Sequence, residues 1–183
     1  MIDEILEYNQ KFVIDKKYEP FITSKYPDKK IAIVTCMDTR LIELLPAALG
    51  LKNGDAKIIK NAGGVIVHPF GSVMRSLLIA IYDLQVEEVY IIGHTDCGVQ
   101  QLNSEDMKNK MKQRGISEEH ITLAKQFGVD LDDWLSGFDD VNKSVMNSME
   151  MVKHHPFIPK DIAIYGFVLD SVTGLLTTVN KKA

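Results

Sequence analysis

The feature that most constrains the fold is an alternation of short apolar runs with amphipathic stretches. Three runs rich in β-branched residues have the character of strands, namely "KKIAIVTCMD" (29–38), "AKIIKNAGG" (56–64) and "EEVYIIGHTDCG" (87–98). The stretches between them, 41–55 and 71–85, have the character of helices. Strands that alternate with helices favour a parallel sheet with right-handed crossover connections. The sequence therefore predicts an α/β fold with a mostly parallel sheet flanked by helices.

The clearest helical pattern lies in 71–85. Its apolar residues follow the i, i+3, i+4 spacing of one helix face: Val73, Met74, Leu77, Leu78, Ile81 and Leu84. Ser72 stands before this face and is expected to cap the helix. From 102 to about 155 the chain is polar and helical in tendency, and we predict a helix over 139–154 that ends before Pro156.

The two ends of the chain carry their own patterns. Residues 161–179, "DIAIYGFVLDSVTGLLTTV", predict two strands around an Asp-Ser-Val-Thr-Gly turn, arranged as a hairpin. The first 26 residues predict a helical arm, whose apolar positions we expect to pack on a partner subunit. A chain of 183 residues that is 45% hydrophobic and 25% charged suits a single domain over 1–183 with its own core.

Charge and hydropathy exclude several classes of partner. The net charge is −4 and acidic and basic residues are mixed along the chain, so we expect no nucleic acid partner. No segment approaches the roughly 18 uncharged apolar residues that span a bilayer, so we expect no membrane partner. Acids within the first few residues interrupt any apolar leader. These observations predict a soluble, cytoplasmic protein.

Both cysteines follow predicted strands at their carboxyl ends. Cys36 ends the first strand, and His94 and Cys97 end the third. Ligands bind at the carboxyl ends of the strands of an open parallel sheet, so adjacent strands would bring these three residues together. Two thiolates and an imidazole are donors that zinc prefers, and three protein ligands leave a fourth position open for a catalytic water.

Asp38 and Arg40 follow Cys36 at intervals of two residues. On an extended backbone, Asp38 points to the same face as Cys36, and Arg40 can hold its carboxylate ionised and oriented. If this ion pair breaks, Asp38 could become a fourth metal ligand. Spacing alone leaves simpler interpretations open, because a lone buried cysteine is usually a packing residue and an Asp-Thr-Arg segment after a strand is usually a helix cap.

Other polar residues near these strands have simpler explanations. His68 could carry protons, but an exposed loop histidine is the more ordinary interpretation. His154 and His155 end a predicted helix, where a cation favours the helix dipole. Asp96 could in principle bind metal, but we expect it to turn away and make the turn hydrogen bond that is common for Asx residues.

Taken together, the motifs resemble those of the β-class carbonic anhydrases, in particular the short bacterial and archaeal members. The resemblance runs over roughly residues 30 to 178, through "CMDTR", "IIKNAGG", "MRSLLIA", "HTDCG", "HPFIP" and "YGFVLDSVTG". It implies zinc held by Cys36, His94 and Cys97, with Asp38 and Arg40 positioning a zinc-bound hydroxide. It also implies Gly63 and Gly64 as lining residues of the cleft, and assembly as a homodimer or a multiple of dimers.

The activity that this resemblance implies is reversible hydration of carbon dioxide to bicarbonate and a proton. Relatives in the family hydrolyse carbonyl sulfide or carbon disulfide with the same ligands, and a catalytically silent zinc-binding homologue is a third alternative. Two segments depart from the pattern of close relatives: "VIVHPFGS" replaces an acidic pair after the glycine turn, and "VQQL" follows "HTDCG". Both departures affect the expected lining of the cleft.

Overall fold

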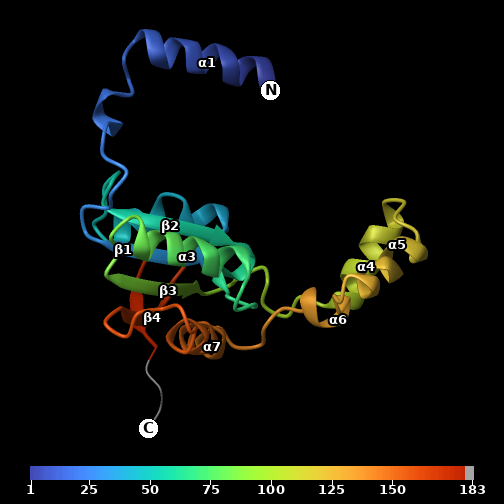
Figure 1. Ribbon diagram of the computed structural model, residues 1–183. Helices are drawn as coiled ribbons and strands as arrows, with labels where there is room; N and C mark the ends of the chain where they lie inside the picture. The colour runs from blue at the N-terminus through green and yellow to red at the C-terminus, as the bar shows by residue number, and fades with distance from the viewer. Residues whose placement is uncertain (180–183) are drawn as a thin grey trace.

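The computed structural model describes residues 1–179 and contains a five-stranded sheet. The strands are β1 (Ile31–Cys36), β2 (Ala56–Asn61), β3 (Glu88–His94), β4 (Ala163–Leu169) and β5 (Leu176–Thr178), in the order β2-β1-β3-β4-β5. The first four strands run parallel, and β5 pairs antiparallel with β4 (Figure 1). The predicted α/β fold and the predicted C-terminal hairpin are both confirmed.

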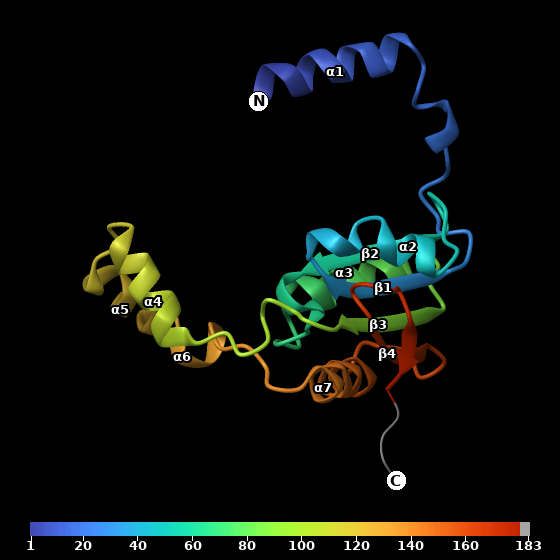
Figure 2. The same cartoon turned by 180° about the vertical axis from the view of Figure 1, so that it is seen from behind.

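Helices cover both faces of the sheet (Figures 1 and 2). α3 (Ser72–Tyr82) and α7 (Val141–Lys153) pack on one face, and α2 (Leu44–Ala48) packs on the other. Successive strand side chains point to opposite faces, so Val34 enters the core beneath α3 and α7 while Ile33 enters the core beneath α2. All six residues of β1 are therefore buried, as the apolar run predicts.

The strand order changes direction at β1. The chain forms β2 on one side of β1 and then crosses to form β3 on the other side. This makes the carboxyl ends of β1 and β3 the switch point of the sheet, the place where open α/β folds bind their ligands. Cys36 is the last residue of β1 and His94 is the last residue of β3.

The N-terminal arm is helical, as predicted, and stands clear of the sheet. α1 (Ile2–Ile14) contains no buried residue, and a short 3-10 turn follows it at Glu19–Phe21 (Figure 1). Its exposed apolar side chains include Ile5 and Leu6, which are more than half exposed. None of the helices within residues 1–179 is long and apolar enough to cross a membrane.

A second projection interrupts the chain between β3 and α7. It consists of α4 (Ser104–Gln113), α5 (Glu118–Gln126) and α6 (Leu131–Trp134), and Figure 2 shows it reaching away from the sheet. Lys108 of α4 pairs with Asp132 of α6 at 2.8 Å. The only tryptophan of the chain, Trp134, lies here and is 65% exposed.

Backbone hydrogen bonds close the base of this projection. Gln101 N donates to the carbonyl of Phe138 at 3.0 Å, and Gly137 N donates to the carbonyl of Leu102 at 2.9 Å. The projection therefore leaves and rejoins the body at one place, only a few residues after Cys97.

Two sequence predictions at helix ends are wrong. α3 begins at Ser72, and its N-cap is Gly71, which turns out of the preceding loop by a hydrogen bond from its N–H to the carbonyl of His68. His155 does not cap α7: it lies beyond the helix end, is buried, and accepts a hydrogen bond from the backbone N–H of Phe157. The predicted helix over 139–154 is confirmed as α7, which Asp140 caps.

Candidate metal centre

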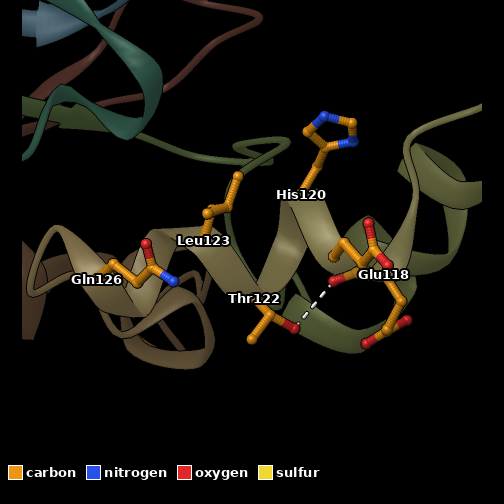
Figure 3. A pocket seen from close by; sticks show the side chains of 6 residues that line it. Glu118, His120, Thr122, Leu123 and Gln126 are labelled. Carbon is orange, nitrogen blue, oxygen red and sulfur yellow. Dashed lines mark hydrogen bonds between the residues drawn. The ribbon is translucent and has the colours of Figure 1, made fainter.

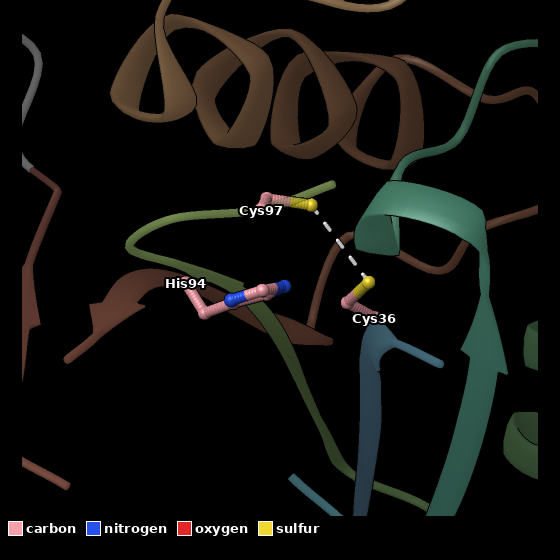
Figure 4. Close-up of side chains that lie close together, drawn as sticks. All are labelled: Cys36, His94 and Cys97. Carbon is pink, nitrogen blue, oxygen red and sulfur yellow. Dashed lines mark hydrogen bonds between the residues drawn. The ribbon is translucent and has the colours of Figure 1, made fainter. Parts of the chain in front are cut away.

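Three side chains converge at the switch point between β1 and β3. Cys36, His94 and Cys97 are buried, and one potential ligand atom from each lies within 4.8 Å of the other two (Figure 4). The two sulfur atoms are 3.8 Å apart. A disulfide needs a sulfur–sulfur distance of about 2.05 Å, so both thiols are free. Two thiolates on a tetrahedral zinc, each at about 2.3 Å, lie about 3.8 Å apart.

The imidazole of His94 is oriented for a metal. Its Nδ1 lies 2.8 Å from the carbonyl oxygen of Thr95, and a carbonyl can only accept, so Nδ1 carries the proton. Nε2 then keeps its lone pair, and this buried atom has no hydrogen-bond partner among residues 1–179. A buried nitrogen without a partner is costly, and metal binding would satisfy it. The three residues therefore fit a zinc ion.

Two glycines shape the backbone behind the ligands. Gly64 has φ +64°, and a Cβ atom at this position would lie 2.8 Å from the backbone nitrogen of Cys36. Gly63 has φ +81°, and a Cβ atom there would lie 3.2 Å from the ring of Phe138 and 3.3 Å from Val99. The glycine turn can therefore approach Cys36 only because it lacks side chains.

Asp38 and Arg40 form an ion pair beside the three ligands. Nε of Arg40 donates to one carboxylate oxygen of Asp38 at 3.0 Å, and Nη2 donates to the other at 2.9 Å. These bonds hold the pKa of Asp38 well below its usual range. Oδ2 of Asp38 lies 3.9 Å from Nε2 of His94, so an ionised carboxylate stands at the edge of the ligand group.

The two thiols differ in acidity. Burial raises the pKa of Cys36, but the His94 ring and the backbone N–H groups of Asp38 and Gly63 outweigh burial and bring it down to about 7. Burial raises the pKa of Cys97, and the charge of Cys36 adds to this effect. Cys36 is therefore the first of the pair to become a thiolate.

Sequence reasoning missed several neighbours of this centre. Lys60 of β2 points its Nζ at the carbonyl oxygen of Cys36, 3.4 Å away, and burial lowers its pKa. Val99 and Phe138 pack in the same apolar cluster as the two cysteines. The sheet register, which pairs Lys60 with Thr35, explains the first contact, whereas Phe138 arrives from the far side of the projection.

Two surface hollows lie away from the three ligands. One lies on α5 and is lined by Glu118, Glu119, His120, Thr122, Leu123 and Gln126; Figure 3 shows that it is formed by one exposed helix. Another lies between the base of the arm and α2, with Phe21, Ile42 and Ile58 among its lining residues. Neither hollow brings metal ligands together.

Comparison with known families decides the affiliation. Residues 31–176 match the family described as carbonic anhydrase. The chain belongs to this family. Within it, the fold matches the β class: the crystal structure of a β-carbonic anhydrase from Trichomonas vaginalis superimposes with a TM-score of 0.90, 36% identity and coverage of 100% of this chain and 99% of that chain.

Two relatives of this β-carbonic anhydrase family member are named for different reactions. YvdA of Bacillus subtilis, which is named a carbonic anhydrase only provisionally, is 54% identical over 178 residues, covering 97% of this chain and 90% of YvdA. A carbon disulfide hydrolase of Acidithiobacillus thiooxidans is 29% identical over 161 residues, covering 81% of this chain and 76% of that enzyme. The family therefore includes proteins that are named for hydration of carbon dioxide and for hydrolysis of carbon disulfide.

Proposed function

We propose that the protein is a zinc enzyme that hydrates carbon dioxide reversibly to bicarbonate and a proton. The observation that carries this proposal is the convergence of Cys36, His94 and Cys97, with the Asp38–Arg40 ion pair at its edge. Zinc in such a site acts as a Lewis acid that makes water a nucleophile near neutral pH. We assign the three residues as its ligands, and the family affiliation supports the assignment.

The side chains beside the ligands would orient the reactants. Asp38 stays ionised because Arg40 binds both of its oxygens, so it accepts a hydrogen bond and cannot donate one. A water molecule at the centre would point a hydrogen at Asp38 and keep a lone pair free for carbon dioxide. Gly63 and Gly64 would line one side of the cleft through their backbone, and Val99 and Phe138 would supply an apolar wall.

The test combines stopped-flow carbon dioxide hydration, measured against pH, with zinc content on the same samples. Cys36→Ala and His94→Ala should lose zinc and activity together. Asp38→Ala should keep zinc and lose most of the activity. His120→Ala, which removes an exposed histidine on α5, is the matched control and should behave as wild type. An active, zinc-free Cys36→Ala protein would contradict the proposal.

A second candidate is hydrolysis of carbon disulfide or carbonyl sulfide, which the relationship to a carbon disulfide hydrolase supports. The two candidates share the proposed ligands, so only the substrate separates them. Supplying each gas in turn and measuring bicarbonate or sulfide release decides between them. Stoichiometric zinc without either activity, at any pH up to about 9, would instead indicate a silent homologue whose fourth position Asp38 closes.

We also propose that the whole chain forms one catalytic domain that works as a homodimer, or a multiple of dimers, in the cytoplasm. The arm over residues 1–26 supports assembly, because α1 exposes its apolar side chains and buries none of them in its own subunit. Two free, buried thiols at the centre suit a reducing compartment.

A further inference from the structure

Arg40 is held by two carboxylates and not only by Asp38. Its Nη1 donates to the Asp96 carboxylate at 2.8 Å, and its Nη2 donates to the Asp96 carbonyl oxygen at 2.7 Å. With the two bonds to Asp38, four of the five N–H groups of the guanidinium are engaged. Arg40 therefore joins the end of β1 to the loop that follows β3.

The backbone of Asp96 is built for this contact. Asp96 lies between His94 and Cys97 and has φ +53°, a left-handed conformation that aspartate tolerates better than most residues. This conformation lets the carbonyl and the carboxylate of one residue both face Arg40. The Asp96 carboxylate accepts from Arg40, and its side chain is 85% exposed, so the turn hydrogen bond expected from the sequence is replaced by an ion pair.

The loop itself has supports that do not involve Asp96. Thr95 N donates to the carbonyl of Leu169 at 3.0 Å, and the hydroxyl of Thr95 accepts from the backbone N–H of Ser171 at 3.0 Å. Gln100 N donates to the carbonyl of Cys97 at 2.9 Å. Removing the Asp96 carboxylate therefore takes the bond from Nη1 of Arg40. It leaves the loop attached to β4.

We propose that Asp96 is a positioning residue that keeps Arg40 on Asp38 and so keeps Asp38 away from the metal position. This inference rests on the proposed function. Asp38 is already near the ligand group, with Oδ2 3.9 Å from Nε2 of His94, and in the described part of the chain Arg40 alone binds both of its oxygens. Without the Asp96 carboxylate, Arg40 keeps its bonds to Asp38 and to the backbone carbonyl of residue 96, but nothing holds its Nη1. Arg40 then leaves Asp38 more often, and the freed carboxylate becomes a fourth protein ligand.

The experiment measures two quantities on full-length, zinc-loaded protein: carbon dioxide hydration and the rate of zinc release to a chelator. Asp96→Ala should keep stoichiometric zinc, release it about tenfold more slowly than wild type, and lose hydration by about 10- to 100-fold. Asp96→Asn keeps an oxygen that can accept from Arg40, so it should recover most of both properties. The double variant Asp96→Ala/Asp38→Ala should release zinc as fast as Asp38→Ala alone.

If Asp96 only supported the loop, its loss would make zinc release faster and not slower. Thr95→Val loosens the same loop without touching Arg40, and a loosened loop should release zinc faster. If Asp96→Ala releases zinc at the wild-type rate or faster, the inference is wrong. If Asp96→Ala does not fold, Arg40→Gln, which frees Asp38 directly, must release zinc slowly. A wild-type protein without hydration activity would remove the proposed function, but the zinc-release comparison would still decide the role of Asp96.

Discussion

Substitution of Gly64 by alanine tests how closely the glycine turn supports the metal centre. Gly64 and Gly50 share φ +64°, but a Cβ atom at Gly50 meets nothing within 4 Å, whereas at Gly64 it lies 2.8 Å from Cys36 N and 2.9 Å from the carbonyl carbon of Thr35. Gly50→Ala is therefore a matched control for the backbone conformation. The difference between the two variants isolates the contact with Cys36.

The expected losses of stability follow from the backbone conformation at each glycine and from the contact at Gly64. Left-handed alanine costs about 1–2 kcal/mol in either variant, and the change in unfolded-chain entropy is common to both. The contact at Gly64 adds about 1–3 kcal/mol, as for an overpacked core position, because both neighbouring atoms are backbone. The free energy of unfolding of Gly64→Ala should therefore be about 2–5 kcal/mol below that of wild type. That of Gly50→Ala should be about 1–2 kcal/mol below.

The assay is urea unfolding of the metal-free proteins at one protein concentration, because bound metal and association both shift apparent stability. Zinc affinity is measured separately, and it should fall about 10- to 100-fold in Gly64→Ala because the ligand Cys36 is displaced. Gly50→Ala should bind zinc as wild type does. Equal stability of the two variants, within about 0.5 kcal/mol, together with unchanged zinc affinity, would refute the reasoning.

Three further predictions concern acidity, packing and assembly. Both thiols must lose their protons to bind zinc, and the pKa of Cys36 is about 7 while that of Cys97 is raised. The apparent zinc association constant should therefore rise at least about tenfold per pH unit between pH 7 and the pKa of Cys97, and more steeply below pH 7. A competition assay that finds no pH dependence of zinc binding would contradict this. Leu77→Ala in the core should cost about 2–5 kcal/mol in urea unfolding, whereas Leu123→Ala, 40% exposed on α5, should stay within about 0.5 kcal/mol. Deleting residues 1–17 should lower the number of subunits that light scattering gives for the assembly, while the remaining chain still unfolds cooperatively in urea. An unchanged number of subunits would refute packing of the arm on a partner.

The strands and the meeting of Cys36 with His94 and Cys97 could be predicted from local patterns. β-branched apolar runs identify β1 and β3 whatever surrounds them, and parallel strands bring their carboxyl ends to one edge. The Asp38–Arg40 pair depends only on a spacing of two residues. Each strand and the Asp38–Arg40 pair are encoded within a few positions of sequence. The parallel sheet then brings Cys36 to His94 and Cys97, which lie 58 and 61 positions away, so a single sequence is sufficient to predict the meeting.

Other features depend on contacts that no local pattern carries. The ion pair of Arg40 with Asp96 joins residues 56 positions apart and requires a left-handed backbone at Asp96. Phe138 reaches the neighbourhood of Gly63 because the projection folds back on its own base. At α3, the turn hydrogen bond of Gly71 sets the start of the helix, although Ser72 is the better cap by residue type.

The placement of Trp134 determines what spectroscopy can report about this protein. Tryptophan dominates intrinsic emission, and the only one in the chain is exposed on α6, in the projection and outside both cores. Its fluorescence therefore follows the surroundings of the projection, while melting of the sheet has to be monitored by circular dichroism. A blue shift of that emission with increasing protein concentration would show that a second molecule covers the projection.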